Sequence, residues 1–355
     1  MTNVSPTANV SDTATVSDTA TVSDQFRRAL RDLRISVTDR CNFRCCYCMP
    51  RDVFGTDFPF MDSSELLSFE EITRVTQVFA GLGVTKVRLT GGEPLVRHGI
   101  ERLVERLVGV EGITDVALTT NGSLLASKAQ ALRDAGLSRV TVSLDSLDED
   151  QFRAISDVKI PLSRVLQGIA TAADVGLHPV KINTVLKRGM NDGQNIFDLA
   201  AFGREHGYVV RFIEYMDVGN TNGWRMDDVV PAAEIVDRIN AVWPVEPVDP
   251  QYTGEVADRY RYLDGAGEVG VISSITTPFC RTCTRARISA KGELYTCLFS
   301  GAGHDLRALL RGGASDEELD AKIKGIWQRR NDRYSAQRTS ATAGLSKVEM
   351  SYIGG

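Results

Sequence analysis

The sequence has no long apolar segment, no secretory leader and no excess of positive charge. No apolar run reaches the roughly 18 residues that mark a candidate membrane-spanning helix. The N-terminus lacks the basic stretch followed by an apolar one that is typical of a signal peptide. The formal net charge of -5 argues against a nucleic-acid surface as the main function, but it is compatible with a local basic pocket. We therefore expect a cytoplasmic protein with no membrane partner and no nucleic-acid partner.

Cysteine is scarce as well, and its 7 residues fall into two groups. One group lies between Cys41 and Cys48, and the other lies between Cys280 and Cys297. An odd number of clustered cysteines in a cytosolic chain indicates metal or redox use rather than disulfides. The chain has 355 residues and is 43% hydrophobic, which suffices for one large domain and a smaller one.

The first cysteine group contains a C-x3-C-x2-C spacing at Cys41, Cys45 and Cys48. Three thiolates on one loop can hold three irons of a 4Fe–4S cluster and leave the fourth iron open to a small molecule. The alternative is a zinc loop, but zinc sites usually have a second cysteine pair nearby, and none follows here. Cys46 is interpreted as a spectator thiol, with competition for iron as the alternative.

The chain divides into three parts by composition and pattern. Residues 1–24 repeat Val-Ser-Asp-Thr-Ala-Thr and predict a disordered tail, with a short stack of β-turns as the alternative. Residues 25–230 alternate strands with helices. The strands are expected at 35–37, 86–90, 116–119, 140–143, 180–185 and 209–214, and the helices at 70–80, 99–109, 123–135, 149–156, 162–175 and 195–206.

This alternation predicts an α/β fold with a parallel sheet and crossover helices. Six units are too few for a closed eight-stranded barrel, so we predict a partial (β/α)6 TIM-like barrel. In such barrels function lies at the C-terminal ends of the strands. The first cysteine loop falls at such an end, as do Gly91-Gly92-Glu93, Thr119, Ser143 and Met216.

Residues 231–355 predict a C-terminal α+β extension with a second metal site. Helices are expected at 231–243, 305–311 and 315–330, with short strands between 252 and 275. Cys280, Cys283 and Cys297 form another three-thiolate set. On these residues alone, a zinc site completed by His304 and an iron–sulfur cluster are equally compatible. Arg285 and Arg287 alternate along one strand, so both guanidiniums face one way, an arrangement that suits phosphate.

Taken together, these motifs resemble those of the radical S-adenosylmethionine (SAM) enzymes and, among them, the GTP 3′,8-cyclase family. The resemblance runs from about Arg34 to Gly355 and rests on the two cysteine sets, Gly91-Gly92-Glu93-Pro94, Arg285 with Arg287, and Gly354-Gly355. It implies a lyase of molybdenum cofactor biosynthesis that converts GTP to (8S)-3′,8-cyclo-7,8-dihydroguanosine 5′-triphosphate. A 5′-deoxyadenosyl radical would abstract the 3′ hydrogen. The alternative is another two-cluster radical SAM enzyme, such as a peptide-modifying maturase.

The resemblance also implies the cofactors and the residues that bind them. Two 4Fe–4S clusters are expected, one at Cys41, Cys45 and Cys48 and one at Cys280, Cys283 and Cys297. SAM is expected beside Tyr47, Gly92, Glu93, Ser143 and Met216. The GTP triphosphate is expected against Arg34, Lys86, Arg88, Lys181, Arg211, Arg285 and Arg287, with Thr119 as a polar contact. Gly354 and Gly355 are expected to enter the active site as a catalytic tail.

Three protein partners follow from the same resemblance. They are an electron donor such as flavodoxin or ferredoxin, a downstream cyclic pyranopterin monophosphate synthase, and a second copy of the chain in a homodimer.

Overall fold

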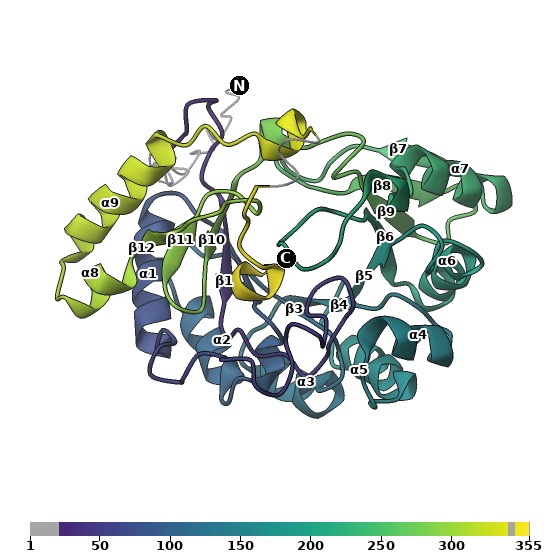
Figure 1. Cartoon of the computed structure of the whole chain (residues 1–355), viewed down its shortest axis with the longest axis horizontal. Helices are drawn as coiled ribbons and strands as arrows, with labels where there is room; N and C mark the ends of the chain where they lie inside the picture. Colours follow the sequence, from purple (N-terminus) through teal and green to yellow (C-terminus); the bar gives the residue numbers. More distant parts are fainter. Residues whose placement is uncertain (1–20, 340–344, 355) are drawn as a thin grey trace, which may run out of the picture.

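A single curved sheet organises the molecule in the computed structural model, which describes residues 21–339 and 345–354 (Figure 1). The described residues form a 12-stranded sheet in the order β12-β11-β10-β1-β2-β3-β4-β5-β6-β9-β8-β7. The strands are β1 (Asp32–Ser36), β2 (Lys86–Thr90), β3 (Asp115–Thr120), β4 (Arg139–Ser143), β5 (Lys181–Leu186), β6 (Val209–Glu214), β7 (Val245–Val248), β8 (Asp258–Tyr262), β9 (Glu268–Ile272), β10 (Arg285–Ile288), β11 (Glu293–Tyr295) and β12 (His304–Asp305).

Helices cover the outer side of this sheet (Figure 1). The α-helices are α1 (Phe69–Gly81), α2 (Ile100–Val108), α3 (Leu125–Asp134), α4 (Glu149–Ser156), α5 (Leu162–Asp174), α6 (Asn195–His206), α7 (Ala232–Val242), α8 (Arg307–Arg311), α9 (Asp316–Gln328) and α11 (Met350–Ile353). Short 3-10 turns are η1 (Pro94–Val96), η2 (Met226–Asp228), η3 (Cys280–Thr282) and η4 (Tyr334–Gln337). The yellow C-terminal segment lies inside the curve of the sheet, beside β1.

The central strands alternate with helices, as the sequence predicts, and β1 to β6 pair in parallel, each with the next. The local signals explain the boundaries. Ser68 and Glu71 form a reciprocal capping box that begins α1, and Gly207, in the left-handed region at φ 71°, ends α6. The partial six-unit barrel is therefore confirmed.

The C-terminal half is not a separate layer, because it continues the barrel sheet at both edges. Strand β10 pairs in parallel with β1, and β9 pairs in parallel with β6. The hairpins β10–β11 and β9–β8 then extend the sheet with antiparallel strands. The predicted boundary near residue 230 therefore does not divide the sheet, because strands that precede and strands that follow this residue belong to the same sheet.

The N-terminal tail is shorter than predicted. Residues 1–20 lie outside the described residues, but residues 21–24 are packed against the protein. Val22 is buried in the main core, and its backbone N–H donates to the Leu82 carbonyl at 3.3 Å. Asp24 is also buried. The prediction of disorder through residue 24 is wrong for these last residues, because one valine of the repeat finds an apolar site that composition alone could not reveal.

Membrane insertion was not expected, and among the described helices none combines the length and the apolar character that a membrane-spanning segment needs.

Candidate active site

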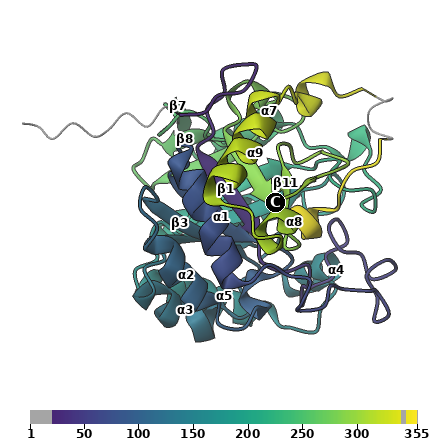
Figure 2. The same ribbon diagram turned by 90° about the vertical axis from the view of Figure 1, so that its left-hand side faces the viewer.

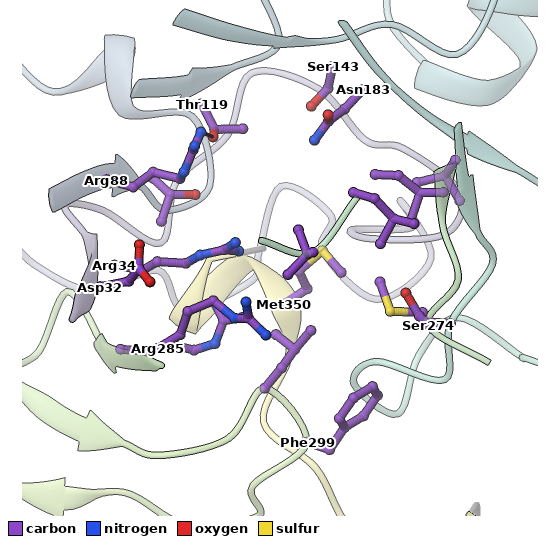
Figure 3. Close-up of a pocket in the computed structure, with 18 of the residues that line it drawn as sticks. Asp32, Arg34, Arg88, Thr119, Ser143, Asn183, Ser274, Arg285, Phe299 and Met350 are labelled. Carbon is purple, nitrogen blue, oxygen red and sulfur yellow. Dashed lines mark hydrogen bonds between the residues drawn. The ribbon is translucent and has the colours of Figure 1, made fainter. Parts of the chain in front are cut away.

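One pocket inside the curve of the sheet contains both cysteine sets and nearly all the residues predicted to bind ligands. The predicted residues that line it are Arg34, Cys41, Cys45, Tyr47, Cys48, Lys86, Arg88, Gly92, Glu93, Thr119, Ser143, Arg211, Met216, Cys280, Cys283, Arg285, Arg287 and Cys297. Figure 3 shows Arg34, Arg88 and Arg285 pointing into the pocket from neighbouring strands, with Ser143 and Asn183 on another side. The fold thus joins residues that lie far apart in the sequence.

The two cysteine sets approach the pocket from opposite ends of the strands. Cys41 follows the C-terminal end of β1, whereas Cys283 precedes the N-terminal end of β10. Strand β10 runs parallel to β1, with Arg287 opposite Arg34. The C-terminal end of β1 and the N-terminal end of β10 therefore lie at opposite edges of the sheet, measured along the strand direction. A molecule in the pocket can therefore contact one cysteine set at each end.

A row of cationic side chains crosses the sheet between the two cysteine sets. Arg34 on β1 is in register with Arg287 on β10 and with Arg88 on β2. Two residues earlier in each strand, Asp32 is in register with Arg285 and Lys86. Neighbouring strands are about 4.8 Å apart, and residues two apart share a face. Several cationic groups therefore face one side of the sheet at short spacing.

The arginines of this row lack the carboxylates that normally compensate buried charge. Within residues 21–339 and 345–354, the ion pairs found involve none of Arg34, Arg88, Arg211, Arg285 and Arg287. Arg88 donates to Thr119 Oγ1 at 2.9 Å, and Arg285 donates to the Gly254 carbonyl at 3.0 Å. These acceptors are neutral, so none of these arginines has a directly bonded carboxylate, and Asp32 on the same face compensates Arg34 and Arg88 only in part.

The pKa values reflect this crowding. Burial, followed by repulsion from Arg287, Arg88 and Arg285, lowers the pKa of Arg34 well below its ordinary value. Burial and a neighbouring arginine lower the pKa of Arg88 to about 10 and that of Arg211 to about 9. Buried cations cost free energy unless an anion accompanies them. The site is therefore built for a ligand that carries several negative charges.

The first cysteine loop is held against the end of β2 by two glycines. The Gly92 N–H donates to the Thr38 carbonyl at 2.9 Å, and the Glu93 N–H donates to the Arg40 carbonyl at 2.8 Å. A Cβ on Gly92 would lie 2.3 Å from the Arg40 carbonyl oxygen, and Gly91 has a φ of 142°. Glycine is required here because the two backbones touch.

Glu93 is buried at the same strand end and organises the next one. Its carboxylate accepts from the Leu95 and Asn121 backbone N–H groups at 2.9 and 2.7 Å and from Thr120 Oγ1 at 2.7 Å. Burial raises its pKa to about 7, even though these hydrogen bonds act in the opposite direction. Glu93 thus fixes the loops of β2 and β3, and its predicted contact with SAM remains a prediction.

The thiols of the first cysteine set are in an anionic environment. Burial, followed by the Glu93 carboxylate, raises the pKa of Cys41 to about 12. Burial and repulsion from Cys41 raise the pKa of Cys48 to about 12 as well. The set can bind as thiolates only when a metal group supplies compensating positive charge.

Carboxylate and amide side chains missed by the sequence analysis complete this end of the pocket. Asp145, which follows β4, accepts from Tyr47 Oη at 2.6 Å and from the Val185 N–H at 2.8 Å. Burial raises its pKa to about 6. Asn121, which follows β3, places Nδ2 3.9 Å from Cys41 Sγ. Their positions directly after strands were the available signal.

The second cysteine set has the opposite electrostatic environment. Burial acts to raise the pKa of Cys283, but Arg285 and Arg330 outweigh it and lower that pKa to about 6. Arg330 Nη2 donates to Cys283 Sγ at 3.2 Å. Burial is the largest influence on Cys297 and raises its pKa to about 12, and the opposing effect of Arg330 is too small to prevent this. Arg330 was not among the predicted residues.

The described residues do not assemble a ready-made site for a single metal ion. Among the described residues, no set of three or more histidine, cysteine, aspartate or glutamate side chains is close enough to bind one metal ion. Thiolates that bind separate irons of a cubane stand further apart than ligands of a single zinc. His304 lies on the exposed strand β12 and does not line the pocket. The zinc alternative for the second set therefore lacks its fourth ligand.

The C-terminal segment enters the pocket wall. Met350 of α11 lines the pocket, and Arg287 Nη1 donates to the Gly354 carbonyl at 2.8 Å. Gly354 has a φ of 69°, and a Cβ there would lie 2.1 Å from Thr90 Cγ2. In Figure 2 this yellow segment and the purple loop after β1 lie on the same side of the molecule. The predicted approach of Gly354 is present, while Gly355 lies outside the described residues.

Two further residues differ from the rest. Lys181 does not line the pocket, although it begins β5 two residues before Asn183, which does. Burial and repulsion from Arg211 lower its pKa to about 8, so it lies close to the cationic row. Cys46 is absent from the pocket lining, as expected for a spectator thiol.

Comparison with known proteins places the chain in a family. Residues 35–200 match the family described as the Radical SAM superfamily, and residues 208–336 match Molybdenum Cofactor Synthesis C. A GTP 3′,8-cyclase of Acidothermus cellulolyticus is 56% identical over 353 residues, which cover 92% of this chain and 97% of the relative. The chain belongs to the GTP 3′,8-cyclase family. Other GTP 3′,8-cyclases include those of Xanthomonas axonopodis pv. citri, 50% identical over 93% of this chain and 98% of the relative, and Staphylococcus aureus, 48% identical over 92% and 97%.

Membership in the GTP 3′,8-cyclase family resolves the alternatives left by the sequence. The alignments cover both cysteine sets and the cationic row between them, so the peptide-modifying maturase is not supported. Both cysteine sets face the pocket, as expected for an enzyme that carries two 4Fe–4S clusters and uses SAM.

Proposed function

We propose that this protein cyclises GTP to (8S)-3′,8-cyclo-7,8-dihydroguanosine 5′-triphosphate, the first step of molybdenum cofactor biosynthesis. One observation carries the proposal. A row of buried and half-buried arginines without directly bonded carboxylates lies between two cysteine sets that enter one pocket from opposite ends. A triphosphate supplies the missing negative charge, and each arginine can bind its oxygens with charge-assisted hydrogen bonds.

The residues divide the work by position. Cys41, Cys45 and Cys48 would hold the first cluster, which together with SAM would supply the radical chemistry that removes the 3′ hydrogen of GTP. Glu93 and Asp145 give this end a negative character that suits the ammonium and sulfonium of SAM. Cys280, Cys283 and Cys297 would hold the second cluster, and the guanine base would bind beside it.

The cationic row holds the substrate in line between the two ends. Arg34, Arg285 and Arg287 face the same side of the sheet at the strands that connect the cysteine sets. Fixing the triphosphate there would restrain the substrate in the pocket and help to exclude water from the reaction. The proposal includes a flavodoxin or ferredoxin as electron donor, a cyclic pyranopterin monophosphate synthase downstream, and a homodimer.

The test is anaerobic incubation of the reconstituted protein with SAM, a reductant and GTP, followed by mass analysis of the nucleotide. A cyclised product with 5′-deoxyadenosine and methionine is expected. Substitution of deuterium at C3′ of GTP should transfer deuterium to 5′-deoxyadenosine. Cleavage of SAM without any change in GTP would contradict the proposal.

A further inference from the structure

A buried ion network lies directly behind the second cysteine set. Asp24, Arg28 and Arg330 are each less than 8% exposed, at 7%, 4% and 4%. Arg28 Nε is 2.6 Å from Asp24 Oδ2, and Arg330 Nη1 is 3.4 Å from the same oxygen. Arg330 Nε is also 3.3 Å from Asp332 Oδ2, so two carboxylates face the two guanidiniums, and what the network offers its surroundings is N–H donors.

Both arginines reach the cysteines themselves. Arg28 Nη1 donates to the Cys280 carbonyl at 2.8 Å, and Arg330 Nη1 donates to the Cys283 carbonyl at 2.8 Å. Arg330 Nη2 also donates to Cys283 Sγ at 3.2 Å. The positions of these arginines are fixed from behind, because Arg330 stacks 4.5 Å from the Trp327 ring and Trp327 Nε1 donates to the Arg28 carbonyl at 3.1 Å.

One donor of this network has no acceptor. Arg28 Nη2 is buried and makes no hydrogen bond to any described residue, yet Arg28 lines the pocket beside Cys280 and Cys283. A buried N–H without an acceptor costs about 1–3 kcal/mol, so native proteins rarely leave one unused. The acceptor is expected in the group that these cysteines hold.

We infer that Arg28 and Arg330, both held by Asp24, are hydrogen-bond donors to the sulfur atoms of the second cluster and raise its reduction potential. The inference rests on the proposed second cluster and adds positioning residues to it. Reduction adds negative charge to a cluster, so nearby positive charge and N–H donors stabilise the reduced form. These two arginines differ from Arg285 and Arg287, which serve the phosphates.

The decisive experiment is a potentiometric titration of the second cluster in the full-length chain, followed by electron paramagnetic resonance. It is done with both clusters present and again in a Cys41→Ala, Cys45→Ala, Cys48→Ala background. Arg330→Gln and Arg28→Gln should each lower the equilibrium constant for reduction of the second cluster by roughly tenfold. For a one-electron couple this makes the reduction potential about 59 mV more negative. Arg330→Lys should recover part of the shift because it restores the charge. GTP affinity and the potential of the first cluster should stay the same.

Arg329→Gln is the matched control, since it removes the same charge from an exposed neighbour. An unchanged potential in Arg330→Gln and Arg28→Gln at full iron content would overturn the inference. Loss of iron from the second site that Arg330→Lys does not restore would also overturn the inference, because it would mean that the arginine only supports the local structure. A loss of GTP affinity as large as that of Arg285→Ala would assign both arginines to the substrate. If the unaltered protein held one cluster only, the proposed function itself would fail.

Discussion

The two cysteine sets have similar numbers of thiols but opposite surroundings. Carboxylates surround the first set, where burial and Glu93 raise the pKa of Cys41 to about 12. Guanidiniums surround the second set, where Arg285 and Arg330 lower the pKa of Cys283 to about 6. Cysteine spacing alone does not distinguish them. The difference supports the proposal that the first end binds cationic SAM and that the second end, with the cationic row, binds anionic GTP.

The largest effect is expected when one cysteine set is removed at a time. Replacing Cys280, Cys283 and Cys297 by Ala should reduce the iron from about eight to about four per chain and abolish cyclised product. Reductive cleavage of SAM should remain measurable, because the first set is intact. Replacing Cys41, Cys45 and Cys48 should abolish both reactions. Iron analysis and chromatography of 5′-deoxyadenosine check this, and full iron in the first variant would contradict the second-cluster assignment.

Changes to the C-terminal tail should have the next largest effect, and they should abolish the cyclised product but not the cleavage of SAM. Gly354→Ala places a Cβ within 2.1 Å of Thr90 Cγ2 in a left-handed conformation, so the tail must leave its position. Removing Gly354 and Gly355 should abolish cyclisation while SAM cleavage persists. Gly81→Ala is the control, since a Cβ there meets nothing within 4 Å. Normal cyclisation by the shortened chain would exclude a role for the tail.

The arginines at the second end should affect GTP but not SAM. Arg285→Ala and Arg287→Ala each remove a charge-assisted contact worth roughly 1.5–3 kcal/mol, which weakens GTP binding by about tenfold to a hundredfold. Arg287→Ala should also slow cyclisation, because it releases the Gly354 carbonyl. Equilibrium binding of GTP, guanosine and SAM checks this, with the exposed Arg261→Ala as control. Equal losses for GTP and guanosine would indicate a structural role instead.

The last effect concerns folding stability rather than ligand binding, and it is the pH dependence that Glu93 contributes at the first end. Burial raises the pKa of Glu93 from 4.5 to about 7, so the folded state prefers its protonated form. Its contribution is fully present below about pH 4.5 and is lost as the pH rises through about 7. The shift corresponds to on the order of 3 kcal/mol.

Melting temperatures of the metal-free protein between pH 5 and 8 measure this contribution. Glu93→Gln should flatten the profile across that range, because the amide cannot ionise. The exposed Glu105→Gln should leave the profile unchanged. A profile that keeps its slope in Glu93→Gln would assign the pH dependence to another group.

Many of the helices, the strands and both cysteine sets could be predicted from the sequence because short-range sequence signals specify them. Capping residues and hydrophobic periodicity located α1 and α6, and cysteine spacing located both metal sets. The network of Asp24, Arg28 and Arg330 could not be found this way. Arg330 Nη1 meets Asp24 Oδ2 across a separation of 306 residues. Arg330 belongs to no motif, and Asp24 ends the N-terminal repeat, whose composition predicts disorder.

The edges of the sheet were missed for a related reason. The predicted second domain rested on a change in the sequence pattern after residue 230. In the structure β9 pairs with β6 and β10 pairs with β1. This pairing is made by backbone groups, so amino-acid composition gives no sign of it. The buried Val22 in the repeat is similar, because its partner Leu82 lies on another element.

The pairing of β1 with β10 also affects how the chain is made. These neighbours lie about 250 residues apart in the sequence, and a ribosome adds roughly 5–20 residues per second. One side of β1 therefore remains an unpaired edge for roughly 12–50 s after it leaves the ribosome. The first cysteine loop emerges long before the strand that closes the wall beside it, so the nascent chain offers iron its first site well before its second.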